Sequence, residues 1–259
     1  MTKFFSAFFA AVLLMAAFSI ARAGVLGADT GESYADPIYK ELSQTLVMMD
    51  GIDVSNPIVA NEYAKMFYCD LYKQNSRNDF DWQKIRHQIM TRVLQKKEYY
   101  RIQYQIPATV KLNVYNFETQ DFPFTPETAL VRVGSIELLG IIGLSDPTKK
   151  VFKLCGSFDW SPVFPINHIV MMNQSLTFDR LKIPMDEAKV LLEKMTAMRN
   201  KDRLLYVRMR FRLQALNRKL PPPPLNLRRS RAEYLSEVTQ IDVFLDEAMT
   251  KFITTIHIK

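Results

Sequence analysis

Three arginines at alternate positions, Arg208, Arg210 and Arg212, are the residues of this sequence best suited to bind an anion. The guanidinium group presents a planar fork of N–H donors, which matches the oxygens of a phosphate or a carboxylate. The surrounding segment, residues 199–231, holds eleven lysines and arginines and one acid, a net charge of +10, whereas the whole chain carries +7. The sequence therefore predicts that an anionic partner docks on this segment.

A second basic group, Arg228, Arg229 and Arg231, follows four prolines at 221–224. Consecutive prolines favour an extended polyproline conformation, which acts as a semi-rigid spacer. We therefore expect residues 217–230 to form a stiff, proline-rich connection. We include these three arginines among the candidate binding residues.

The arginines have a second interpretation as an ordinary solvated face of a sheet. Acidic residues on a neighbouring strand can neutralise such a row through cross-strand pairs. Three acids near the C-terminus, Glu237, Asp242 and Asp246, are available if the last strand lies beside the basic one. Three acids cannot balance the whole segment, and both interpretations stay open.

One set of residues could support nucleophilic catalysis: Cys155, Asp159 and His168. A thiolate nucleophile needs a nearby base and an acid that orients the base, and these three supply the residue types. Closeness in sequence does not establish the geometry. A hydrolase that uses this site is the alternative functional hypothesis, and whether the protein is an enzyme stays uncertain, with the balance against it.

Cofactor and metal chemistry find little support in the sequence. The chain has three histidines, far apart, and none lies in a metal-ligand motif. It has eight glycines and no glycine-rich phosphate loop. We therefore expect no cofactor and no metal site.

The first 23 residues predict export. A short basic start precedes an apolar run at 4–20, and Ala21-Arg22-Ala23 fits a signal-peptidase site. Cleavage would remove two cations and leave a net charge of +5. No later stretch is apolar enough to span a bilayer, so we expect a periplasmic or secreted protein without a transmembrane segment.

Two cysteines, Cys69 and Cys155, would enter an oxidising compartment after export. Such a compartment permits a disulfide between them. Free cysteines are also commonly buried without pairing. The sequence leaves both states open.

Helical spacing of apolar residues identifies the elements that precede and flank these sites. Residues 24–50 open as a flexible segment with a short helix at 39–49. Asn56 and Pro57 are a strong helix start, and this helix is expected to reach about residue 74. A second long helix begins near Asp79 or Asp81, and a third is predicted at 185–198.

Alternating apolar and polar residues predict antiparallel strands with one solvated face. The pattern is clearest at 205–213, the strand that carries the arginines, and recurs at 100–106 and 110–114. Other strands are predicted at 130–133, 135–142, 151–154, 166–172 and 238–246, and a short turn or helix is expected from there to Lys259. The fold class is therefore α+β: an N-terminal helix pair packed on a mainly antiparallel sheet, with a third helix before the basic strand. We expect residues 51–259 to form a single domain.

These observations favour an exported, non-enzymatic binding or interaction protein with a basic face. Its partner would be an anionic envelope component, such as a lipid headgroup, lipopolysaccharide or peptidoglycan, or else an acidic protein. Export argues against nucleic acid as the partner.

Overall fold

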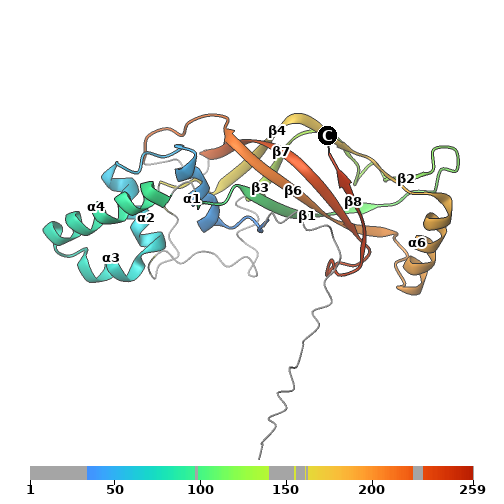
Figure 1. The fold of residues 1–259 in the computed structure, drawn as a ribbon, viewed down its shortest axis with the longest axis horizontal. Helices are drawn as coiled ribbons and strands as arrows, with labels where there is room; N and C mark the ends of the chain where they lie inside the picture. Colours follow the sequence, from blue (N-terminus) through green and yellow to red (C-terminus); the bar gives the residue numbers. More distant parts are fainter. Residues whose placement is uncertain are drawn as a thin grey trace, which may run out of the picture.

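The computed structural model describes residues 34–96, 99–139, 155, 161, 163–223 and 230–258. It confirms the predicted α+β class. N-terminal helices precede a mixed, mostly antiparallel sheet that curls into a half-barrel (Figure 1). The predicted signal peptide at 1–23 and the predicted strand at 151–154 lie outside the described residues.

Most of the described helices lie at the two ends of the molecule. In chain order the described helices are α1 (Tyr39–Met48), α2 (Pro57–Phe67), α3 (Cys69–Asn75), α4 (Asp79–Lys96) and α6 (Met185–Ala197). Helices α2, α3 and α4 gather at one end of the sheet and α6 lies at the other (Figure 1). The Asn56 side chain caps α2 by accepting a hydrogen bond of 2.9 Å from the Ile58 amide, as its sequence position predicts.

The single helix expected up to residue 74 is two helices, so that prediction is wrong in its length. Tyr68, with φ −134° and ψ 44°, has left the helical conformation, and α3 begins at the next residue. The Tyr68 amide still donates to the Ala64 carbonyl, which closes the last turn of α2. The helical spacing of apolar residues does not show such a break, because it continues on both sides.

The strands form one large sheet and one small one. They are β1 (Gln103–Lys111), β2 (Asp121–Pro123), β3 (Leu130–Leu139), β4 (Asn167–Phe178), β5 (Arg180–Lys182), β6 (Leu204–Leu216), β7 (Arg231–Phe244) and β8 (Phe252–His257). The large sheet has the order β1-β6-β7-β4-β3, with β8 also paired to β7, and β2 pairs with β5. Only the β4–β7 pair is parallel among the named strands.

Three strand predictions are corrected. The strands expected at 130–133 and 135–142 are one strand, β3, with register shifts near Val133 and Ser135. The strands expected on either side of Pro107 are one strand, β1, which tolerates the proline because it lies at the edge of the sheet. The turn or helix expected up to Lys259 is instead β8, which pairs antiparallel with β7.

The two faces of β6 differ sharply. Its inner face carries Leu205, Val207, Met209, Phe211 and Leu213, each at most 3% exposed and part of the hydrophobic core. Its outer face carries the three arginines, which are half-buried. The alternation predicted from the sequence is therefore present from Leu204 to Leu213.

A disulfide joins Cys69, at the start of α3, to Cys155, between β3 and β4, with the Cα atoms 5.1 Å apart. It closes a separation of 86 residues. In the chain-entropy model a loop of this length stabilises the fold by about 4.6 kcal/mol. The bond ties the helical end of the molecule to the connection between two strands.

Candidate functional site

The outer face of β6 is the candidate site. Antiparallel pairing with β7 sets Arg208 opposite Asp242, Arg210 opposite Gln240, and Arg212 opposite Glu237. A register shift lies between Arg210 and Phe211. The strand on the other side, β1, offers polar or small residues at the paired positions, among them Gln103 and Gln105.

Arg210 belongs to a buried polar network. Its Nη2 lies 3.0 Å from Oδ2 of Asp242, whose side chain is 5% exposed. The other oxygen, Oδ1, accepts hydrogen bonds from Gln240 Nε2 at 3.0 Å and from Thr255 Oγ1 at 2.7 Å. Both oxygens of Asp242 are thus satisfied, as a buried carboxylate requires. Arg210 therefore has a structural role whatever else it does.

Aromatic rings hold two of the guanidinium groups in place. Arg208 lies over the ring of Phe244 at 5.1 Å, and Arg210 lies over the ring of Tyr34 at the same distance. Tyr34 is fixed in turn by a 3.0 Å hydrogen bond to Thr239 on β7. A cation over a ring face is attracted by the ring quadrupole. Within the described part of the chain, no carboxylate forms an ion pair with Arg208.

The three acids considered for neutralisation behave differently. Asp242 pairs with Arg210. Glu237 lies opposite Arg212 in the register and accepts a hydrogen bond from Gln214 at 3.0 Å. Asp246 lies in the β7–β8 turn, where it accepts hydrogen bonds from Thr250 and Lys251. Burial acts to raise the Asp246 pKa, but these bonds outweigh it and the pKa is lowered.

The second basic group is only partly described. Arg231 forms an ion pair with Glu233, and Arg218 lies 3.1 Å from the same carboxylate. Asn217 donates to Glu233 at 3.0 Å, so this one acid joins both ends of the 217–230 connection. Burial acts to raise the Glu233 pKa, but the donors outweigh it and lower the pKa. Arg228 and Arg229 lie outside the described residues.

Two of the three residues of the hydrolase alternative, Cys155 and His168, are described, and both are engaged in other contacts. Cys155 is held in the disulfide, so its sulfur is not a free thiolate. His168 is fully buried, with Nδ1 2.9 Å from the Tyr234 hydroxyl and Nε2 3.0 Å from the Pro165 carbonyl. Burial lowers the His168 pKa to about 3, so the ring is neutral. Asp159 lies outside the described residues.

Sequence reasoning missed a groove between α6 and β8. It measures about 620 Å³ and is lined by both elements and by Leu245. It was missed because residues 251–259 were expected to form a turn or a helix. The β-branched run at 253–256 was the signal that could have found β8.

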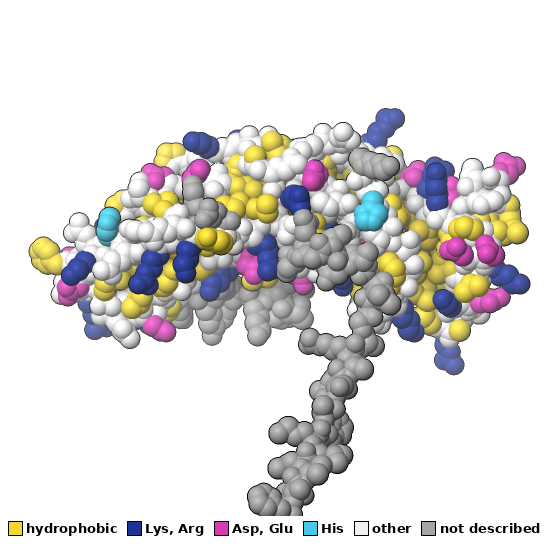
Figure 2. Space-filling model, in the orientation of Figure 1, with side chains coloured by type: hydrophobic (Ala, Val, Ile, Leu, Met, Phe, Trp, Pro, Cys, Tyr) yellow, Lys and Arg dark blue, Asp and Glu magenta, His cyan; other side chains and the backbone are white. Residues whose placement is uncertain are grey.

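The described residues hold no group of three or more histidine, cysteine or acidic side chains that could bind a metal. None of their helices has the length and apolar character needed to cross a bilayer. Figure 2 shows basic and acidic side chains spread over the visible face of the molecule.

No curated protein and no solved structure matches the chain. A family model described as "Domain of unknown function (DUF4852)" matches residues 58–194. The match runs from α2 into α6, so the candidate site on β6 lies beyond it. Because these residues make up more than half of the chain, the protein belongs to the DUF4852 family.

Proposed function

We propose that this is an exported, non-enzymatic binding protein that docks an anionic envelope component on the outer face of β6. The observation that carries the proposal is the state of Arg208. Its guanidinium is held over Phe244, forms no ion pair with the described residues, and lies on the same face as Arg210. Arg210 is balanced by Asp242, so Arg208 leaves an ordered positive charge for a partner.

A side chain that is already held in one conformation binds a ligand more favourably, because it loses less conformational entropy when the ligand arrives. The Phe244 ring lowers that cost at Arg208, and Asp242 and Tyr34 lower it at Arg210. Residues at alternate strand positions have their Cα atoms about 7 Å apart along the strand. This spacing suits neighbouring phosphate or carboxylate groups of an envelope polymer or lipid surface.

Export is supported by the signal-peptide pattern at 1–23 and by the disulfide between Cys69 and Cys155, a bond typical of oxidising compartments. The hydrolase alternative gains no support, since its nucleophile is bonded and its histidine is buried.

The sharpest test replaces Arg208 alone. A triple change that includes Arg210 would leave Asp242 buried without its cation, and a loss of binding could then reflect unfolding. We expect Arg208→Gln to keep the fold and to weaken binding to phosphatidylglycerol vesicles about fivefold at low salt, since each cation near an anionic surface contributes about 1 kcal/mol. A parallel assay with soluble peptidoglycan fragments identifies which envelope component is bound.

The matched control is Arg92→Gln, which removes the same charge from an exposed position on α4. It tests whether net charge alone explains binding. Equal losses for the two variants, or wild-type binding by Arg208→Gln, would remove the outer face of β6 from the site. Wild-type binding that does not fade with added salt would contradict an electrostatic contact.

A further inference from the structure

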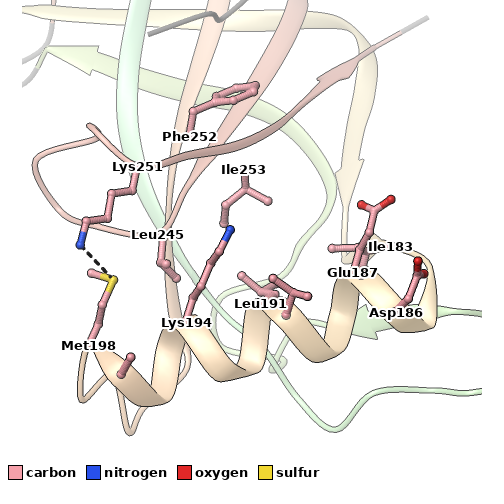
Figure 3. Close-up of a pocket in the computed structure, with 12 residues that line it drawn as sticks. Ile183, Asp186, Glu187, Leu191, Lys194, Met198, Leu245, Lys251, Phe252 and Ile253 are labelled. Carbon is pink, nitrogen blue, oxygen red and sulfur yellow. Dashed lines mark hydrogen bonds between the residues drawn. The ribbon is translucent and has the colours of Figure 1, made fainter. Parts of the chain in front are cut away.

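The groove between α6 and β8 has an apolar floor and partly exposed apolar walls (Figure 3). Leu191 of α6, Leu245 after β7 and Ile253 of β8 line it. Val190 on α6 is 46% exposed, and Met198, directly after the helix, is 36% exposed. Figure 2 shows hydrophobic side chains among charged ones at this end of the molecule. A contiguous exposed apolar surface with charged side chains around it is typical of an interaction site.

The charges around the groove are divided between its two ends. Asp186 and Glu187 lie at the start of α6, and Lys194 and Lys251 lie toward its other end (Figure 3). Within the described residues none of these four side chains forms an ion pair; the Lys251 amine instead lies 3.4 Å from the Met198 sulfur. Acids at a helix start and a lysine near its end also suit the helix dipole.

The spacing makes this pattern complementary to itself. Glu187 and Lys194 are seven residues apart, two helical turns, so they lie on the same side of α6 about 10 Å from each other. Val190 lies between them. Turning a second helix antiparallel about a twofold axis near Val190 reverses the order of acid, apolar residue and base. Each acid then meets one base of the other helix, which gives two acid–base pairs.

We propose that the groove docks a second copy of this chain through antiparallel contact of the two α6 helices. Glu187 of each copy pairs with Lys194 of the other, and the two Val190 side chains meet near the axis. The same patch serves both copies, as a twofold interface requires. Phe252 and Ile253 of β8 extend the apolar contact beyond the helix.

The test is sedimentation equilibrium of the mature protein with paired charge reversals. We expect wild type to show a concentration-dependent dimer. Glu187→Lys alone and Lys194→Glu alone each place two like-charge contacts in the interface, so each weakens dimerisation on the order of tenfold or more. Both side chains are exposed, and circular dichroism should show an unchanged fold.

The two single variants provide a decisive mixture. Glu187→Lys presents only lysines at the two positions and Lys194→Glu presents only acids, so a mixed dimer regains both attractive pairs. We expect the mixture, and also the doubly reversed chain, to dimerise within about threefold of wild type. Lys189→Glu changes an exposed residue of α6 that does not line the groove and should have little effect.

Three results would overturn the proposal: a monomeric wild type up to about 0.5 mM, single reversals that dimerise as well as wild type, or a mixture that stays monomeric. Val190→Glu gives an independent check, because it inserts two carboxylates at the axis and should abolish the dimer. Arg208→Gln should leave the dimer unchanged, which separates this interface from the proposed anion site.

Discussion

The side chains on the two faces of β6 make different kinds of contact: apolar packing on the inner face and ionic contacts on the outer face. On the inner face five apolar side chains are buried in the common core, where each contacts several neighbours. On the outer face Arg210 depends on one carboxylate, Asp242, set opposite the strand by the β7 register. Packing on the inner face is thus distributed over many contacts, whereas charge on the outer face depends on single cross-strand partners. The two kinds of contact can be compared by replacing one side chain on each face and measuring the loss of unfolding free energy.

The largest loss is expected on the inner face. Phe211 is 0% exposed, and Phe211→Ala removes its buried ring and leaves a cavity, so unfolding free energy should fall by about 4 kcal/mol. Urea denaturation followed by circular dichroism measures it. The control on the outer face of the same strand is Tyr206→Ala, which is half-buried and should lose about 1 kcal/mol. Equal losses would contradict the distinction between the faces.

The next largest effect is expected at the outer-face network. Arg210→Gln removes the cation from a carboxylate that is 5% exposed and leaves its charge uncompensated. Breaking a buried pair by removing one partner costs about 3 kcal/mol or more. The same denaturation assay, applied to Arg210→Gln and to Arg208→Gln, tests whether the two arginines differ as their contacts imply.

The cause can be isolated with a second change, Asp242→Asn, in the Arg210→Gln background. It removes the stranded charge and keeps an oxygen that can accept from Gln240 and Thr255. The double variant should therefore be more stable than Arg210→Gln alone, with a coupling of about 1 kcal/mol or more. If Arg210→Gln costs no more than Arg208→Gln, the network does not stabilise the fold as described.

The same contrast explains what the sequence could and could not predict. The alternation along 205–213 was sufficient to assign β6 and its two faces, because a strand repeats every two residues. The α+β class followed from the order of helical and alternating segments. Which acid meets which arginine depends on register, and β7 shifts register between the positions opposite Arg210 and Phe211. No single-strand pattern encodes such a shift.

The candidate site was predicted only in part, because its contacts also depend on how distant strands pair. The sequence identified the arginines and Asp242 but grouped Asp246 with them, whereas Asp246 lies in a turn that exists only because β8 pairs with β7. The aromatic support from Tyr34 and Phe244 also comes from distant segments. Pairwise contacts between segments far apart along the chain decided these details.

His168 on β4 extends the comparison, since it is a titratable side chain in a fully buried position. Its folded-state pKa is lowered to about 3 from 6.5, chiefly by burial. Between these values the unfolded chain binds a proton that the folded protein does not, so stability falls as pH falls from about 6.5 toward 3. The unfolding free energy at about pH 5 should be about 2 kcal/mol lower than at pH 7.5 through this group alone.

Urea denaturation across that range measures this slope, and His168→Gln tests its origin. A glutamine can donate to the Pro165 carbonyl and accept from the Tyr234 hydroxyl, as His168 does, but it does not titrate. The variant should be less stable than wild type at pH 7.5 because its side chain fills less space, but its unfolding free energy should be nearly constant between pH 7.5 and about 5, so the gap to wild type should narrow as pH falls. Carboxyls with a lowered pKa, such as those of Glu233 and Asp246, change the unfolding free energy only at lower pH, where the unfolded chain begins to bind their protons. An unchanged slope in His168→Gln would therefore show that a group other than His168 controls stability in this range.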